Sequence, residues 1–266
     1  MPSNRPLDPA QADQTGMAGR VALVTGGTRG IGLAIALRLA GSGASVLVCG
    51  RTQPGPLPAG IEFAAADVRD PEQARDLVAA ATARFGRLDV AVNNAGGSPS
   101  VPAAAASPNL VTAVVGLNLL APFFVAQAAN AVMQDQDGGG LILNIGSVSA
   151  LRPAPGTAAY AAAKAGLITL TRALAIEWAP AVRVNCLTAG LVSTGDSAAH
   201  YGSEQALGAV AATVPLGRMA TPDDIADACL LLASPLARYV SGANLVVDGG
   251  GQRPAFADAA RPERGP

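Results

Sequence analysis

A tyrosine and a lysine, Tyr160 and Lys164, stand four residues apart in a stretch that is otherwise mostly small and apolar. Residues at this spacing are neighbours on one face of an α-helix. A phenol ionises at about pH 10 in isolation, and a fixed positive charge beside it lowers that pKa. The pair therefore predicts an acid/base group that gives a proton to a developing alkoxide or takes one from an alcohol.

Two further polar residues add to this interpretation. Ser147 ends an apolar run thirteen residues before Tyr160, and its hydroxyl is suited to hold a carbonyl oxygen. Asn118 interrupts an apolar helical run, where a buried amide needs hydrogen-bond partners. A Tyr-x-x-x-Lys pair by itself is a weak signal, since most such pairs lie on surfaces, so the interpretation depends on the combination.

A glycine loop follows the first apolar run, with Gly26, Gly30 and Gly32 between a predicted strand and a predicted helix. Glycines at these positions let the backbone turn sharply, approach a diphosphate and present helix N-terminal N–H groups to it. The spacing is G-x-x-x-G-x-G rather than G-x-G-x-x-G, and no P-loop lysine follows. The loop predicts dinucleotide binding, the alternative being an ordinary glycine-rich turn.

The charges near this loop favour one dinucleotide. An acidic residue at the end of the second strand would accept the adenosine ribose 2′-hydroxyl, but Gly50 and Arg51 stand there instead. Arg29 lies within the loop, and two guanidinium groups suit a 2′-phosphate. The sequence favours NADP(H). NAD(H) stays open, because Arg51 could be solvated and Arg29 could pair elsewhere.

The elements that must position these residues alternate along the chain. Apolar runs of strand length cover 20–25, 45–50, 61–66, 88–94, 141–147, 182–188 and 243–248, and helical runs cover 31–42, 71–85, 109–134, 156–178 and 222–234. Most strand runs are continuously apolar, as in parallel strands covered on both faces. This series predicts one α/β domain over 17–250, with a doubly wound sheet. The Pro/Gly-rich segment 51–60 is predicted to cross between strands without a helix.

Three segments outside this series have their own composition. Residues 1–16 and 251–266 are rich in proline and predict flexible tails. Residues 191–217 are rich in Gly, Ser and Ala and predict a mobile lid over the substrate. The single histidine, His200, lies in this lid. One histidine excludes a histidine-cluster metal site and argues against a Ser-His-Asp hydrolase, so no metal is predicted.

Composition limits the partners and the compartment. The net charge of −1 and pI of about 5.8 argue against nucleic-acid and anionic-membrane surfaces. The three cysteines are far apart and flanked by apolar residues, which indicates reduced thiols in an intracellular protein. The amino-terminal residues lack the apolar core of a secretion signal. These observations predict a cytoplasmic location.

One uncharged stretch, 90–134, is long enough to include a bilayer span. It carries Asn118, Pro122, Gln127 and Asn130, however, and has no Trp or Tyr at its ends to mark a membrane interface. We therefore expect a helix of a soluble protein rather than a membrane span. Such an apolar helix must be covered on both sides, by the sheet on one and by a second subunit on the other.

The motifs together resemble the short-chain dehydrogenases/reductases over about residues 18–250. They are TGGTRGIG (25–32), Asp67-Val68, NNAG (93–96), Asn118, Ser147, YAAAK (160–164) and VSGANLVVDGG (240–250). Within that family the sequence is most similar to bacterial 3-oxoacyl-thioester reductases and related secondary-alcohol dehydrogenases. The resemblance implies a Rossmann-type sheet of seven parallel strands in the order 3-2-1-4-5-6-7. It also implies a homotetramer, or a dimer, that packs through helices 109–134 and 156–178.

The resemblance further implies hydride transfer between NADP(H) and a ketone or secondary alcohol, which includes 3-oxoacyl thioesters and other apolar ketones. Tyr160 would be the acid/base and Ser147 would polarise the carbonyl. Lys164 would bind the nicotinamide ribose and lower the pKa of Tyr160, and Asn118 would support a water-borne proton relay. The cofactor-binding residues would be Gly26, Thr28, Arg29, Gly30, Ile31, Gly32, Arg51, Asp67, Val68, Asn94, Ala95, Gly96, Tyr160, Lys164, Gly190 and Val192.

The sequence departs from the family pattern at Ala189, where a proline is usual after the sixth strand. The short segment 51–60 also reduces the wall beside the adenosine ribose. An alternative function is a catalytically idle dinucleotide-binding sensor or scaffold, because a fold does not determine an activity. The complete set Asn118, Ser147, Tyr160 and Lys164 argues against it, since a binding module has no need of a tuned phenol.

Overall fold

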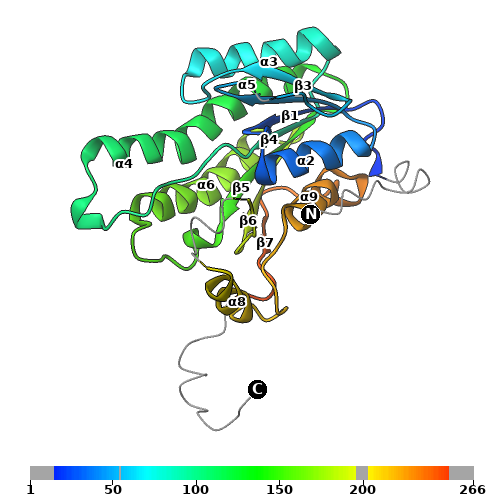
Figure 1. Cartoon of the computed structure of the whole chain (residues 1–266). Coiled ribbons are helices and arrows are strands. Elements are labelled where there is room, and N and C mark those ends of the chain that lie inside the picture. The colour runs from blue at the N-terminus through cyan, green and yellow to red at the C-terminus, as the bar shows by residue number, and fades with distance from the viewer. Residues whose placement is uncertain (1–14, 54, 196–202, 252–266) are drawn as a thin grey trace.

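A computed structural model describes residues 15–53, 55–195 and 203–251 of the 266-residue chain. Most of the two predicted tails lies outside the described residues, as does His200. A central sheet is covered by helices on both faces (Figure 1). Its strands are β1 Val21–Thr25, β2 Ser45–Gly50, β3 Ile61–Ala65, β4 Val90–Asn93, β5 Gly140–Ser147, β6 Val182–Ala189 and β7 Asn244–Val247.

All strand pairs are parallel, and the order is β3-β2-β1-β4-β5-β6-β7. The predicted doubly wound fold and strand order are therefore confirmed. Each strand begins and ends within two residues of its predicted bounds. The order reverses beside β1, and in open α/β sheets ligands bind at the carboxyl ends of the strands near such a reversal.

The helices also follow the prediction closely. They are α2 Gly30–Gly41, α3 Pro71–Phe85, α4 Pro108–Val115, α5 Ala121–Asp135, α6 Ala158–Glu177, α8 Glu204–Ala212 and α9 Pro222–Ala233, with short turns η2 Ala103–Ala105, η4 Val148–Ala150 and η5 Pro235–Ala237. Helices α2 and α9 cover one face of the sheet, and α3, α5 and α6 cover the other. Among described residues 51–53 and 55–60 the crossover from β2 to β3 contains no helix, as predicted.

Local sequence explains how α9 begins. The Thr221 hydroxyl accepts a hydrogen bond from the Asp224 amide, and the Asp224 carboxylate accepts one from the Thr221 amide. This capping box satisfies amides that the first helical turn leaves unpaired. Pro222 follows at the first helical position, where a missing N–H costs nothing.

The helix predicted over 109–134 is interrupted. A π-helical turn, η3 Gly116–Leu120, joins α4 to α5 and contains Asn118. Such turns insert one extra residue into a helix and occur often at functional sites. Apolar periodicity could not reveal the turn, because all residues around Asn118 are apolar or glycine.

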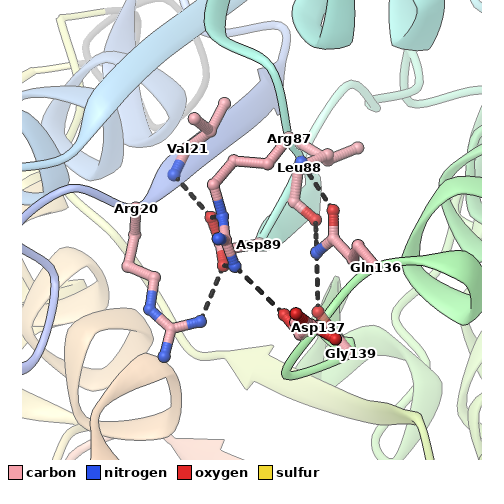
Figure 2. A network of polar contacts seen from close by, with 8 residues as sticks. All are labelled: Arg20, Val21, Arg87, Leu88, Asp89, Gln136, Asp137 and Gly139. Carbon is pink, nitrogen blue, oxygen red and sulfur yellow. Dashed lines mark hydrogen bonds and ion pairs between the residues drawn. The ribbon is translucent and has the colours of Figure 1, made fainter.

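A polar network holds the amino-terminal edge of the sheet (Figure 2). The buried Asp89 carboxylate accepts two hydrogen bonds from Arg87, at 2.7 and 2.8 Å, and one from Arg20 at 2.6 Å. It also accepts one from the Val21 amide at 2.9 Å. Gln136 binds the backbone of Leu88 in both directions. The network thus connects the starts of β1 and β4 to the end of α5.

Candidate active site

A cleft of about 630 Å³ lies at the carboxyl ends of β1, β2, β4, β5 and β6. All but one of the residues predicted to act in binding or catalysis line it. Those residues are Gly26, Thr28, Arg29, Gly30, Ile31, Gly32, Arg51, Asp67, Val68, Asn94, Ala95, Gly96, Ser147, Tyr160, Lys164, Gly190 and Val192. The exception is Asn118, which lies behind the cleft wall.

The glycine loop has the backbone shape that the sequence predicts. Gly26 has a φ of +62°, and Gly30, the first residue of α2, has a φ of +54°. Residues other than glycine rarely adopt this left-handed region of backbone conformation. A Cβ on Gly32 would lie 2.3 Å from the Gly26 carbonyl oxygen, so only glycine fits this close approach. A Cβ on Gly30 would meet no atom within 4 Å, so the start of α2 is open on that side.

Asn94 holds the glycine loop against β4. Its side-chain amide donates to the carbonyl oxygens of Thr25 at 2.9 Å and Gly26 at 3.1 Å. The Thr25 hydroxyl in turn accepts from the amides of Asn94 and Ala95, both at 3.0 Å. These bonds rigidify the turn that the first helix amides must present to a ligand.

Charged side chains gather around β2 and β3 at one end of the cleft. The exposed Arg51 lies there, and the carboxylate of Asp67 accepts hydrogen bonds at 2.9 and 3.1 Å from Nε of Arg69. The hydrogen bond from Arg69 is the main reason that the pKa of Asp67 lies below its ordinary value, and the charge of Arg51 adds to it. Sequence reasoning missed Arg69, although it directly follows the Asp67-Val68 motif.

Tyr160 and Lys164 project from α6 into the same cleft. The Lys164 ammonium lies 5.8 Å from the centre of the Tyr160 ring and donates a 2.7 Å hydrogen bond to the carbonyl oxygen of Ile145. Lys164 is buried, 3% exposed. Burial lowers its pKa to about 8, so the ammonium still predominates at neutral pH.

The net pKa of Tyr160 is raised, whereas the sequence predicts that the charge of Lys164 lowers it. Burial raises the pKa of Tyr160, and the hydrogen bond with the Ser147 hydroxyl opposes that rise. The physical reason is desolvation, because a phenolate in an apolar wall loses more hydration than the neighbouring groups replace. The phenol is therefore held protonated at neutral pH.

Ser147 is the last residue of β5 and caps the short turn η4. Its hydroxyl oxygen accepts a hydrogen bond of 3.2 Å from the Ser149 amide. That bond leaves the hydroxyl proton to be donated elsewhere. Ser147 pairs in register with Ala189 of β6, so the residue that replaces the usual proline lines the same cleft.

Asn118 is fully buried and supports the wall from behind. Its side chain accepts from the Gly97 amide at 3.0 Å and donates to the carbonyl oxygens of Gly97 and Val114, both at 2.9 Å. A Cβ on Gly96 would lie 2.8 Å from the Asn118 oxygen and 3.3 Å from the Lys164 nitrogen. Asn118 therefore positions the Gly96–Gly97 strip beside Lys164, and its role in a proton relay stays a prediction.

Part of the predicted lid is also visible. Val192 forms a parallel bridge with Ala220, which anchors the start of the segment. Helix α8 follows within it, while His200 is among residues 196–202, outside the described part. Within residues 15–53, 55–195 and 203–251 no group of three His, Cys, Asp or Glu side chains could hold a metal ion.

The cleft fits a dinucleotide on three observations. Its glycines leave room for backbone approach, the open start of α2 presents amides, and basic side chains lie at the end where the second strand stops. Sequence reasoning did not single out Leu117 or Gly97, which also line the cleft. Leu117 escaped notice because it belongs to the π-helical turn.

Comparisons with known proteins agree with this geometry. A family model described as enoyl-(acyl carrier protein) reductase matches residues 26–252. The L-rhamnose 1-dehydrogenase (NAD(P)(+)) of Azotobacter vinelandii is 37% identical, over 87% of this chain and 96% of that protein. The 3alpha-hydroxysteroid dehydrogenase of Mediterraneibacter gnavus is also 37% identical, over 86% of this chain and 96% of its own.

A solved structure shows the same fold. The aldohexose dehydrogenase of Thermoplasma acidophilum superposes with a TM-score of 0.84 at 27% identity, over 89% of this chain and 95% of that one. These similar proteins are named for acting on sugars and steroids. The shared feature is therefore the reaction type rather than the substrate.

Proposed function

The chain belongs to the short-chain dehydrogenase/reductase family, and from that premise we propose that it transfers hydride reversibly between NADP(H) and a ketone or secondary alcohol. That it is an oxidoreductase of CH–OH and C=O groups with a nicotinamide cofactor follows from the family. The choice of NADP(H), the catalytic role of Tyr160 and the apolar substrate are the proposal. One observation carries it: a single cleft brings together the glycine loop, Arg51 and the Ser147–Tyr160–Lys164 group.

The chain's own residues would manage the proton. When bound, the nicotinamide supplies or accepts the hydride. In reduction the Tyr160 hydroxyl gives its proton to the carbonyl oxygen, and the Ser147 hydroxyl donates a hydrogen bond to the same oxygen. The Lys164 ammonium stabilises the phenolate that is left, because it is cationic at neutral pH. In oxidation the same groups act in reverse.

The cofactor would lie along the carboxyl ends of the strands. Amides at the start of α2 would meet the diphosphate, and Lys164 would reach the nicotinamide ribose. Arg51 and Arg29 would meet the 2′-phosphate. Arg69 donates hydrogen bonds to both carboxylate oxygens of Asp67, and its positive charge keeps that carboxylate from repelling the phosphate. Together these charges support NADP(H) over NAD(H).

We expect Arg51→Asp to reverse the cofactor preference, because a carboxylate repels a 2′-phosphate and accepts the 2′-hydroxyl of NADH. The ratio of kcat/KM for NADPH over NADH should fall by about tenfold or more, the change from one lost charge contact. Steady-state kinetics with both cofactors measures this. Arg75→Asp, at an exposed position of α3, is the matched control. An unchanged ratio in Arg51→Asp would remove Arg51 from the explanation of specificity.

The activity itself is tested by following NADPH absorbance with a panel of ketones. We propose an apolar ketone or a 3-oxoacyl thioester, since the apolar Leu117, Ile145 and Ala189 line the same cleft as Ser147. Turnover of any panel member distinguishes an enzyme from an idle dinucleotide-binding sensor or scaffold. Binding of NADPH without turnover of the panel would favour the sensor.

We further propose a homotetramer or dimer that packs through α4–α5 and α6. The helical run Pro108–Asp135, which comprises α4, η3 and α5, is long and apolar enough to cross a membrane, and only 33% of its most apolar window is buried in the chain. Val111 and Leu120 are exposed on it, and Ile176 on α6 is 80% exposed. Light scattering after gel filtration should give two or four chain masses. A monomer of about one chain mass at micromolar concentration would contradict the proposal.

A further inference from the structure

We propose that the amino-terminal edge of the sheet carries a second binding site, which takes a small oxyanion of the phosphate class. A pocket of about 240 Å³ lies there, where β1, β4 and β5 begin and α9 ends. Because the strands are parallel, this edge is opposite to the one that forms the candidate active site. The two cavities have no lining residue in common.

The charged residues of this pocket are three arginines, Arg20, Arg183 and Arg238, and one aspartate, Asp89. The aspartate is already neutralised, because Arg87 holds both of its oxygens from outside the pocket. Arg20 adds one bond from a single terminal nitrogen. A guanidinium has five N–H donors, and Figure 2 shows the rest of this group extending away from the carboxylate. Arg20 therefore keeps donors for a ligand.

The other two arginines have no carboxylate partner among the described residues. Arg183 donates to the carbonyl oxygens of Leu232, Ala237 and Val240, at 3.0 to 3.2 Å. The Leu232 and Ala237 carbonyls lie at the ends of α9 and η5, and such dipoles offset only part of a full charge. Arg238 is exposed, and its side chain makes no hydrogen bond or ion pair in the part of the chain that the structure describes. The pocket thus holds an excess of positive charge.

The size and the donor type select the ligand. The pocket is smaller than the roughly 300–1,000 Å³ of sites for drug-sized molecules, so it suits an ion or a small phosphate-bearing group. Guanidinium forks match the oxygens of such an anion in pairs. A residue without a side chain, Gly138, lies beside Arg20. A Cβ on Gly138 would be 4.0 Å from Nη1 of Arg20. An anion can therefore approach Arg20 past Gly138 without meeting a side chain there.

The test is a calorimetric titration of the full-length protein with sodium phosphate, at constant ionic strength set with sodium chloride. Arg238→Gln should weaken phosphate binding by about tenfold, the loss expected for one hydrogen bond between charged groups. Arg51→Gln is the matched control, because Arg51 lies in the other cavity and is also exposed. Arg238→Gln should leave kcat unchanged, since it lies far from the candidate active site along the strands.

The outcomes separate clearly. Phosphate binding that falls in Arg238→Gln and persists in Arg51→Gln supports the pocket. Binding that falls only in Arg51→Gln, or no binding beyond that of chloride, overturns it. Crystals soaked in selenate give a direct check, because anomalous density would mark the oxyanion. Density between Arg20, Arg183 and Arg238 supports the site, and density confined to the other cavity contradicts it. Either result is independent of whether the protein uses NADP(H).

Discussion

Replacing Tyr160 by Phe is expected to lower kcat for ketone reduction by about 10²–10⁴-fold, the usual contribution of a general acid. The phenyl ring keeps the shape of the cleft wall but has no proton to give. The Ser147 hydroxyl and the buried Lys164 stay in place, so NADPH binding should change little. Stopped assays of ketone reduction and a fluorescence titration with NADPH measure the two effects separately.

Tyr239→Phe is the matched control for this substitution. Tyr239 is fully exposed and outside the cleft, so loss of its hydroxyl should leave kcat unchanged. Equal turnover by wild type and Tyr160→Phe would show that another group supplies the proton. Loss of both NADPH binding and turnover in Tyr160→Phe would instead indicate a disturbed cleft.

The pH dependence of the wild-type enzyme provides a second test of Tyr160. Burial raises the pKa of this phenol, so the acid form needed for reduction is present across neutral pH. Oxidation of an alcohol needs the phenolate and should become faster as the pH rises. Lys164, with a pKa of about 8, loses its charge at a lower pH than the phenol ionises, and this weakens the support for the phenolate. The rate of alcohol oxidation should therefore rise less steeply with pH than the ionisation of a single group predicts.

Replacing Asp89 by Asn is expected to lower the free energy of unfolding by about 3 kcal/mol, the lower end of the range for breaking a buried ion pair. The carboxylate is 3% exposed, but its partners Arg20 and Arg87 are 44% and 36% exposed, and solvent screens part of their charge. Asn keeps one acceptor oxygen but lacks the negative charge and the second acceptor, so the two cations and the Val21 amide no longer all have a partner. Urea unfolding followed by circular dichroism measures the change.

The pH dependence of stability has a definite sign at Asp89. Burial by itself would raise the pKa of this carboxyl, but hydrogen bonds from Arg87, Arg20 and the Val21 amide outweigh it, and the net pKa is lowered. The carboxylate therefore stabilises the fold above its unfolded pKa of about 3.9 and loses that effect as the pH falls through the folded value. Asp89→Asn should flatten the acid limb of the stability curve.

Asp76→Asn is the matched control, because Asp76 is exposed on α3 and its side chain makes no hydrogen bond or ion pair among the described residues. Its effect on stability should lie within about 0.5 kcal/mol, as for other surface substitutions. Equal stability of the two variants would show that the network of Figure 2 contributes nothing measurable.

The sequence by itself was sufficient for the architecture. Strands buried on both faces are continuously apolar, and the capping signals around Thr221 act within one helical turn, so both are readable from neighbouring residues. The glycine loop and the four-residue spacing of Tyr160 and Lys164 are local in the same sense. The strand order came from the resemblance to a family, and the structure confirms it.

Only the tertiary structure decided the electrostatics and the supports of the candidate site. The pKa of Tyr160 goes up rather than down because desolvation depends on every group packed around the phenol. Asn118 bonds to Gly97, twenty-one residues away, through a π-helical turn that leaves no mark in apolar periodicity. The positive pocket at the other edge joins Arg20, Arg183 and Arg238, which are far apart in the chain. Burial and long-range contacts arise only when distant segments fold together, so no local pattern encodes them.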